Sequence, residues 1–367
     1  MLRSEAMADI RIGVSGWRYA PWRGGFYPKG LPQRAELEFI SRKFPAVEIN
    51  GSFYSLQRPE CYARWYEQTP RGFVFAVKGP RYITHMLKLR DCEQPLANFL
   101  ASGVFKLADK LGPFLWQFPA SFRFDRARME SFFALLPRDT EQALAIARRR
   151  ARWMKGRTSL AITAHAKLRH AVEFRHESCL DSSFVDLLRD HGIAFVVAET
   201  AGLWPLVHDV TADFIYMRLH GDKELYRSGY SDAALGRWAK RIEAWHRGGE
   251  PEGASKISPG YTPAVRPRDI YCFFDNTDVK LRAPFDALTL MRKLGLGAAA
   301  SGNGAAAPGD SAGEPGDGAT DSGDAGAESR NGATASGDGA LHRRRRAPGR
   351  SPRRGPVGRA GGVRGRR

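Results

Sequence analysis

Cysteine is scarce in this sequence, and its positions exclude several common classes of site. Four cysteines occur in 367 residues, at Cys61, Cys92, Cys179 and Cys272, and no two are close enough for a CxxC pair. Such wide spacing gives neither a zinc-finger ligand set nor a disulfide framework. We therefore expect four free thiols, which is typical of a protein kept in the reducing cytoplasm.

Long apolar stretches are also missing. No run approaches the roughly 18 apolar residues of a membrane-spanning helix, and residues 1–9 lack the apolar centre of a signal peptide. The patterns GxGxxG and GxxxxGK(S/T) do not follow the first predicted strand, and HExxH does not occur. The sequence therefore predicts no membrane partner, and it lacks these motifs for a dinucleotide, a P-loop nucleotide or a metalloprotease zinc ion.

Large apolar residues become rare after residue 296. From residue 297 the chain consists mainly of Gly, Ala, Ser, Pro and Asp, and its last part is rich in Arg. Such a segment cannot bury enough apolar surface to offset the entropy lost on ordering. We therefore predict one folded body over residues 9–296 and a disordered tail over residues 297–367.

Acidic residues are too few to balance the basic ones. The formal net charge is +18, and residues 341–367 contribute 11 arginines and no acid. Residues 298–340 hold one arginine and seven acids, so the body itself keeps a charge of +13. A basic protein favours anionic partners. We expect an anionic small-molecule substrate for the body, and non-specific nucleic-acid binding by the Arg-rich end of the tail.

Eight short predicted strands alternate with helical segments along the body. The strands cover residues 10–15, 47–50, 73–78, 113–118, 171–175, 193–198, 213–220 and 270–275. Helices are predicted at residues 33–44, 59–68, 94–110, 125–136, 181–191, 232–247 and 284–294, and residues 138–169 are expected to be irregular. This alternation favours parallel strands with crossover helices. Eight units predict an α/β fold, a closed parallel (β/α)8 TIM-type barrel, with a doubly wound open sheet as the alternative.

Polar side chains interrupt these strands near their C-terminal ends, where β/α barrels carry their active sites. In residues 171–175, Glu173 and Arg175 share one face of the strand, and Val172 and Phe174 share the other. Structure alone is a poor reason to bury so many charges, so we predict one pocket at this end of the barrel. Its predicted polar residues are Glu48, Asn50, Lys78, Gln117, Glu173, Arg175, Arg218, His220 and Asp275.

Each group of these residues has an expected role. Lys78, Arg175 and Arg218 are predicted to bind the anionic part of the substrate, because both cation types suit phosphate. Glu173 and His220 are predicted to transfer protons. The remaining catalytic residue is Asp275, which would orient His220 or bind a metal. Aromatic residues in the loops after the strands are expected to form walls for a ring-shaped substrate, namely Trp17, Tyr54, Tyr226 and Tyr230.

A metal site is weakly indicated, and its ligands stay unassigned. Histidine and carboxylate side chains that could meet at the same end of the barrel are His176, His220, Glu173, Glu199 and Asp275. Such side chains form ordinary ligand sets for divalent metals, so a divalent metal cofactor is an open alternative. The other histidines considered are expected at the surface or at helix ends, namely His85, His165, His170, His191 and His208.

Nine segments of the body resemble the YecE-like family, a bacterial family of unknown function. They are IRIGVSGW (10–17), VEINGSFY (47–54), FVFAVKGPRYITH (73–85), LGPFLWQFP (111–119), AVEFRHES (171–178), ETAG (199–202), ADFIYMRLHG (212–221), LYRSGYSD (225–232) and FFDNTD (273–278). The resemblance covers about residues 10–295 and implies a TIM-type barrel. It implies no settled activity. The family is distantly similar in fold to metal-dependent barrels that act on sugars and on abasic DNA, which is an analogy of fold alone.

These observations favour an enzyme over the other classes. We expect a hydrolase or isomerase that acts on an anionic substrate, such as a phosphorylated sugar or a nucleotide-type molecule. A non-catalytic nucleic-acid-binding protein, a ligand-sensing barrel and, by fold analogy, a metal-dependent nuclease are the alternatives. The sequence assigns neither the substrate and reaction type nor the oligomeric state.

Overall fold

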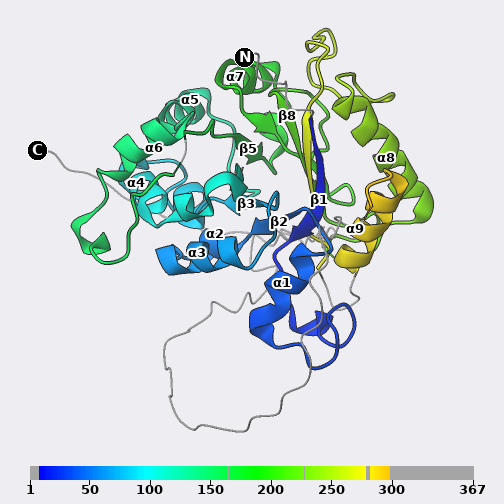
Figure 1. The fold of residues 1–367 in the computed structure, drawn as a ribbon. Helices are drawn as coiled ribbons and strands as arrows, with labels where there is room; N and C mark the ends of the chain where they lie inside the picture. Colours follow the sequence, from blue (N-terminus) through cyan, green and yellow to red (C-terminus); the bar gives the residue numbers. More distant parts are fainter. Residues whose placement is uncertain (1–7, 164, 227, 278–281, 298–367) are drawn as a thin grey trace, which may run out of the picture. The chain divides into compact units, whose positions relative to one another are not determined.

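The strands of the protein form one parallel sheet (Figure 1). The computed structural model describes residues 8–163, 165–226, 228–277 and 282–297. Its strands are β1 Ile10–Ser15, β2 Ala46–Ile49, β3 Val74–Lys78, β4 Leu111–Gln117, β5 His170–Glu173, β6 Ala194–Phe195, β7 Val197–Glu199, β8 Phe214–Leu219 and β9 Asp269–Phe274. They follow the order β6-β5-β4-β3-β2-β1-β9-β8-β7, so strands that follow one another in the chain are mostly neighbours in space.

The strands β6 and β7 are two pieces of one barrel position. β6 pairs with β5 and β7 pairs with β8, while the N–H of Val196 between them donates to the carbonyl of Val172 at 2.9 Å. The hydroxyl of Thr211 interrupts the pairing with β8, because it accepts from Phe195 N at 2.8 Å and donates to Ile193 O at 2.7 Å. Nine strands therefore fill eight positions of the predicted TIM-type barrel, and the strand expected over residues 193–198 is broken in its middle.

The α-helices lie around the outside of the strands (Figure 1). They are α1 Glu36–Ser41, α2 Gly51–Tyr54, α3 Pro59–Glu67, α4 Glu93–Ala101, α5 Arg126–Leu135, α6 Thr140–Ala147, α7 Ser182–His191, α8 Asp232–His246 and α9 Arg282–Lys293. Side chains of Asp125, Asp181 and Ser231 accept from backbone N–H groups at the starts of α5, α7 and α8. Such caps satisfy donors that the first turn of a helix leaves free, and they explain why these helices begin where the sequence predicts.

The two faces of the strands have different partners. Residues that point outward, such as Val47, Val77 and Met217, belong to the large apolar core that also includes helix residues. Residues that point inward, such as Ala76 and Leu115, form a second, smaller cluster inside the barrel. The alternation along each strand therefore directs the residues in register with Ala76 and Leu115 into the barrel, and these include Lys78 and Gln117.

Two further segments differ from their predicted structure. The connection expected to be irregular contains the helix α6 and the short 3-10 segment Arg152–Met154. The helix expected over residues 94–110 is α4 followed by the 3-10 segment Val104–Lys110. Gly103 separates the two with a positive φ of 102°, a backbone conformation that glycine adopts without a steric penalty. The cluster of arginines at positions 148, 149, 150 and 152 in this connection lies beyond the end of α6.

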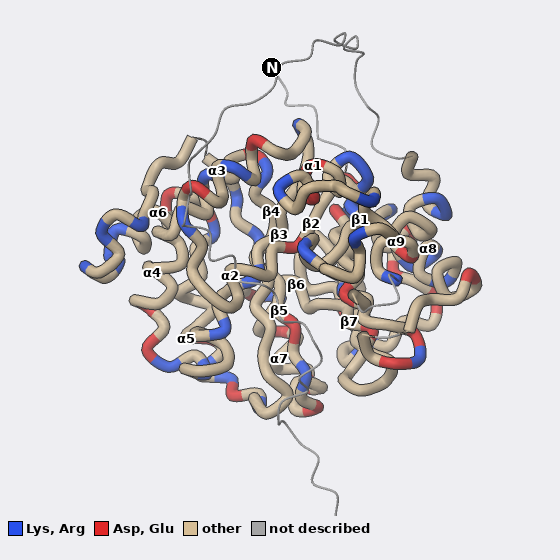
Figure 2. Tube along the Cα trace, turned by 90° about the horizontal axis from the view of Figure 1, so that it is seen from below, with Lys and Arg blue, Asp and Glu red and all other residues tan. Residues whose placement is uncertain are grey.

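That cluster makes the segment after α6 basic, as Figure 2 shows. The cationic residues of this segment are Arg148, Arg149, Arg150, Arg152, Lys155 and Arg157. The tail predicted over residues 297–367 lies outside the described residues except for its first residue. None of the described helices has both the length and the apolar composition needed to cross a membrane.

Candidate functional site

Polar residues from six strands meet inside the C-terminal end of the barrel. Ser15 pairs in register with Glu48, and Gln117 pairs in register with Glu173, so each pair shares one face of the sheet. Hydrogen bonds and ion pairs then join residues of β1, β2, β5 and β8 with Asp275, which follows β9. The predicted convergence of Glu48, Glu173, Arg218 and Asp275 is therefore present in the structure.

Arg218 is the centre of this cluster and is fully buried. Its Nη1 lies 2.6 Å from Glu173 Oε2, and its Nη2 lies 3.0 Å from Glu48 Oε1 and 2.9 Å from Asp275 Oδ2. Its Nε donates to the second oxygen of Glu48 at 3.1 Å, and Nη2 also donates to Ser15 Oγ at 3.1 Å. Every nitrogen of the guanidinium is thus engaged by the protein itself, which leaves no free edge for a substrate anion.

Glu48 is held in the same network from the other side. The hydroxyls of Ser15 and Tyr216 donate to its two carboxylate oxygens, the latter at 2.7 Å. Burial, followed by the charge of Glu48, raises the pKa of Tyr216 well above its usual value. Asn50 lies just beyond the end of β2 and donates to Ser15 Oγ at 2.9 Å. These contacts hold the Glu48 carboxylate in place beside Arg218.

Glu173 is clamped between two arginines. Arg175 Nε donates to Glu173 Oε1 at 2.7 Å, and Arg218 occupies the other oxygen. Burial acts to raise the pKa of Glu173, but the charges of Arg175 and Arg218 hold it well below its ordinary value. The guanidinium of Arg175 also lies 3.9 Å from the ring centroid of Trp204 and donates to the Tyr226 hydroxyl at 3.3 Å. Glu173 is therefore a carboxylate at every ordinary pH.

His220 is fully buried and neutral. Its Nε2 lies 3.1 Å from Arg218 Nη1, which can only donate, so Nε2 accepts and carries no proton. The ring proton is therefore on Nδ1, which lies 3.1 Å from Glu199 O. Asp275 Oδ2 is 3.3 Å from the same Nε2. Burial, and then the charge of Arg218, lower the pKa of His220 to about 4. Both ring nitrogens thus have partners within the protein.

Lys78 differs from the other cations of the site. It ends β3, is 8% exposed, and its ammonium lies 4.2 Å from the ring centroid of Phe53. No hydrogen bond or ion pair joins this ammonium to any residue that the structure describes. Burial, and then the charge of Arg218, lower the pKa of Lys78 to about 8. A buried amine in this state is partly unprotonated near neutral pH.

Two aromatic residues that were predicted to form walls of the pocket, Trp17 and Tyr230, lie outside the barrel, so the prediction is wrong for both. Trp17 packs outside the barrel, with its ring 5.3 Å from that of Trp65 in α3, because Gly16 turns the chain with a positive φ of 81°. Tyr230 also lies outside, against the outward-facing Phe274, and its hydroxyl accepts from Gly221 N at 3.0 Å. Both residues therefore stabilise the loops after their strands.

The other two aromatic residues lie at the predicted end of the barrel. The Tyr226 ring is 5.4 Å from that of His220. Tyr54 in α2 is 49% exposed, and burial, followed by the charge of Asp275, raises its pKa. A shallow cavity of about 430 Å³ opens beside Arg175 and Trp204. These residues form the rim of the candidate site.

Two residues of the rim were not predicted from the sequence. His85, which was expected at the surface or at a helix end, is only partly exposed and lies in the short π-helical segment Tyr82–Met86, with its ring 5.1 Å from Phe53. Burial, and then the charges of Lys78 and Arg175, lower its pKa to about 3. Trp204, which stacks on Arg175, is the second residue. Both lie in connections, where no strand period indicates the direction of a side chain.

The donors of the site do not fit a divalent metal. In the ranges that the structure describes, no three His, Cys, Asp or Glu side chains come together as metal ligands. The carboxylates that gather here are engaged by Arg218, and His220 Nε2 faces the same guanidinium. A cation at this point would have to displace Arg218, so we assign no step of the chemistry to a metal.

A family model matches most of the body, over residues 11–310, under the description "Protein of unknown function DUF72". The chain belongs to this family. Among curated relatives, the UPF0759 protein YecE of Escherichia coli K12 is 36% identical over 114 residues, which are 31% of this chain and 39% of that protein. The UPF0759 protein YunF of Bacillus subtilis is 31% identical over 118 residues, which are 31% of this chain and 41% of that protein. The matches thus span about two fifths of the length of these relatives.

Solved structures of the DUF72 family share the fold. The crystal structure of a family member from Thermotoga maritima has a TM-score of 0.59 and 26% identity, and the match covers 78% of this chain and 99% of that one. A member from Enterococcus faecalis has a TM-score of 0.55 and 17% identity, with 78% of this chain and 96% of that chain covered. The comparisons confirm the predicted family and barrel, and the family description carries no activity.

Proposed function

We propose that the protein is an enzyme that acts on a small anionic substrate at the C-terminal end of the barrel, with Lys78 as the residue that contacts the substrate. The observation that carries this proposal is Lys78, a residue only 8% exposed whose ammonium forms neither a hydrogen bond nor an ion pair with the described residues. A buried charge without a partner is costly. An anionic substrate group would supply the missing partner.

The charges around Lys78 support a single anionic contact. Arg218 is neutralised by the carboxylates of Glu48, Glu173 and Asp275, and Arg175 is paired with Glu173. We therefore assign Arg218 the role of positioning these carboxylates, rather than the substrate contact expected from the sequence. Arg175, stacked on Trp204 beside the shallow cavity, is placed to bind a second part of the substrate.

The lowered pKa of Lys78, about 8, also suits proton transfer. A general acid or base works best when its pKa lies near the operating pH, and catalytic lysines are tuned toward 7–8 by burial. Glu173 stays ionised and His220 stays neutral over this range, because their pKa values are lowered. We therefore propose Lys78 as the proton-transfer group of an isomerase or hydrolase, and Glu173 and His220 as residues that set its electrostatic surroundings.

The test is a substrate screen with matched variants. The full chain would be assayed against sugar phosphates, other phosphate esters and DNA with abasic sites, with divalent metals and with a chelator. Lys78→Met removes the amine at similar size, and Lys106→Met removes an exposed lysine as the control. We expect Lys78→Met to lose at least about 100-fold in kcat/KM and Lys106→Met to match the wild type. A substrate that the wild type and Lys78→Met turn over equally well would contradict the proposal.

A further inference from the structure

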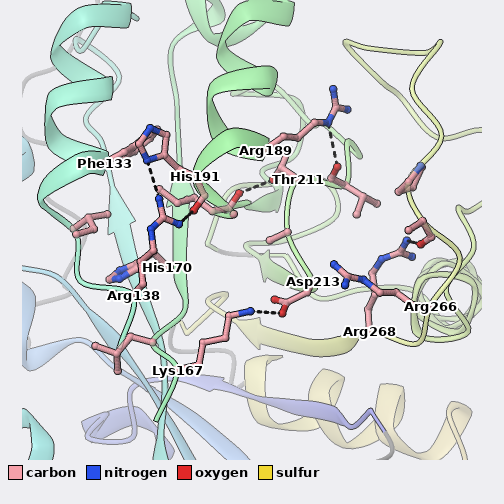
Figure 3. Close-up of a pocket in the computed structure, with 18 of the residues that line it drawn as sticks. Phe133, Arg138, Lys167, His170, Arg189, His191, Thr211, Asp213, Arg266 and Arg268 are labelled. Atoms are coloured by element: carbon pink, nitrogen blue, oxygen red, sulfur yellow. Dashed lines mark hydrogen bonds and ion pairs between the residues drawn. The ribbon is translucent and has the colours of Figure 1, made fainter. Parts of the chain in front are cut away.

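A second cavity lies at the opposite, N-terminal end of the barrel (Figure 3). Its volume is about 340 Å³. It is lined by segments that precede strands, namely Lys167 before β5, Asp213 before β8, and Arg266 and Arg268 before β9. Arg138, which follows α5, and the last turn of α7 complete the wall. This place is separate from the candidate site, because the ends of parallel strands point to opposite sides of a barrel.

Cations dominate the charged residues that line this cavity. Five Lys and Arg side chains line it, and Asp213 is the single acid among the described residues that do so. Figure 3 shows the carboxylate of Asp213 between Lys167 and Arg266, and Lys167 Nζ lies 2.6 Å from it. One carboxylate shared among several cations leaves the wall positive.

Arg268 is the most unusual of these cations because it is 1% exposed. Its guanidinium is held by backbone carbonyls alone, at 3.4 Å from Trp245 O, 3.0 Å from Gly249 O and 2.8 Å from Ala264 O. Within the described residues no carboxylate comes within ion-pair distance of it. Burial is the largest cause that lowers the pKa of this guanidinium. A buried cation that is hydrogen-bonded but not neutralised favours an anion nearby.

Two more arginines reach the cavity without a carboxylate partner. Arg138 Nη1 donates to the carbonyl of His191 at 2.7 Å, and its Nη2 lies 3.3 Å from His191 Nδ1. Arg266 is exposed and forms neither a hydrogen bond nor an ion pair with the residues described. A fifth cation, Arg189, lies 3.7 Å from the ring centroid of Tyr261 at the edge of the cavity. Two of the five cations, Arg138 and Arg266, are thus available to a ligand, and the buried Arg268 adds positive charge that no carboxylate neutralises.

We propose that this cavity binds the phosphate group of a small phosphorylated molecule. The guanidinium fork of arginine matches phosphate oxygens in a bidentate way, and Arg138 and Arg266 line this cavity without a carboxylate partner. The volume of about 340 Å³ suits a small molecule. Tyr261, stacked on Arg189, supplies a flat wall for a ring attached to the phosphate. This site is independent of the proposed function, since none of its residues belongs to the cluster around Arg218.

The test measures binding of chosen phosphate probes to the full chain by isothermal titration calorimetry. The probes are inorganic pyrophosphate, a nucleoside diphosphate and a single-stranded oligonucleotide. Arg266→Glu reverses a charge on an exposed side chain that forms no hydrogen bond or ion pair with the described residues, so we expect the fold to be retained, as circular dichroism would verify. Lys29→Glu is the control, because Lys29 is exposed and lies in the loop after β1 at the other end of the barrel.

We expect the small probes to bind and Arg266→Glu to weaken them at least about tenfold. Lys29→Glu, which changes a charge at the opposite end of the barrel, should bind these probes like the wild type. Equal binding by wild type and Arg266→Glu would overturn the proposal. Binding of the oligonucleotide but of neither small probe would also overturn it, because the cavity would then hold no small phosphorylated molecule.

Discussion

Two lysines on neighbouring strands are both buried, yet their surroundings are opposite. Lys78 ends β3 and Lys110 directly precedes β4, and they are 8% and 4% exposed. Each ammonium lies 4.2 Å from an aromatic ring centroid, that of Phe53 or Tyr66. The Lys110 ammonium also donates to the carbonyls of Tyr66 and Thr69, both at 2.6 Å, and to the Thr69 hydroxyl at 3.1 Å. The Lys78 ammonium has no such partner among the described residues.

This difference separates a structural lysine from a functional one. A buried ammonium that donates three hydrogen bonds ties the end of α3 to the start of β4. A buried ammonium that donates none lowers stability. Such a cost is expected where a protein keeps a group for chemistry, and Lys78 lies at the end of the barrel that carries active sites in this fold.

The largest effect is expected when the cluster beside Lys78 loses its centre. Arg218→Met leaves Glu48, Glu173 and Asp275 with their main cation removed. Breaking a buried charge network from one side destabilises by about 3–5 kcal/mol, measured as the free energy of unfolding in urea. Arg34→Met, at an exposed arginine, is the control and should stay within about 0.5 kcal/mol of the wild type. Equal stability of both variants would show that the network around Arg218 does not stabilise the fold.

The pH dependence of stability is the next largest effect. The pKa of Lys78 is lowered from 10.5 to about 8 in the folded protein, so between these values the unfolded chain binds more protons. The stability penalty of Lys78 is therefore complete below pH 8 and is relieved as the pH rises toward 10.5. The free energy of unfolding of the wild type, relative to Lys78→Met, should rise by about 3 kcal/mol over this window. A difference that does not change with pH would contradict the lowered pKa.

A smaller effect distinguishes the two lysines directly at pH 7. Lys110→Met removes the donor to Tyr66 O and Thr69 O and should destabilise by about 2 kcal/mol. Lys78→Met removes an unpaired buried charge and should leave stability unchanged or raised. Urea unfolding of the two variants side by side gives the comparison. The reverse order, with Lys78→Met the less stable variant, would mean that Lys78 has a structural partner.

The smallest effect on stability is expected from the tail. We propose that its Arg-rich end binds polyanions through counterion release. Deleting residues 297–367 should change the free energy of unfolding by less than about 0.5 kcal/mol and remove most salt-sensitive nucleic-acid binding. Fluorescence anisotropy with one oligonucleotide across several salt concentrations would compare the full and truncated chains. The same affinity and salt slope in both would assign the binding to the body.

The alternation of side chains along each strand allowed the sequence to predict which strand residues face into the barrel. Strands alternate inward and outward, so the sequence placed Glu48, Lys78, Glu173 and Arg218 on inward faces, and the structure confirms this. The break in the strand at Val196 depends on the hydroxyl of Thr211, fifteen residues later in the chain. The pattern of residues within the strand therefore could not predict this break.

Loops set the limit of what the sequence could predict. Trp17 and Tyr230 follow strands that carry site residues, yet positive φ at Gly16 and the hydrogen bond from Gly221 N direct them outward. His85 reaches the site through a π-helical segment that has no simple sequence pattern. The cavity at the N-terminal end combines residues from five separate connections, and the strand pattern predicts only which residues share a face.

Titration of the Lys78 amine itself tests the proposed role of Lys78 most directly. NMR of the full chain labelled with 13C and 15N in lysine side chains would follow this amine from pH 6 to 12, with the signal assigned by its loss in Lys78→Met. We expect a midpoint near the lowered pKa of about 8. A midpoint at the ordinary lysine value of 10.5 or above would show a paired or solvated ammonium, and would contradict the claim that Lys78 is the free reactive group of the site.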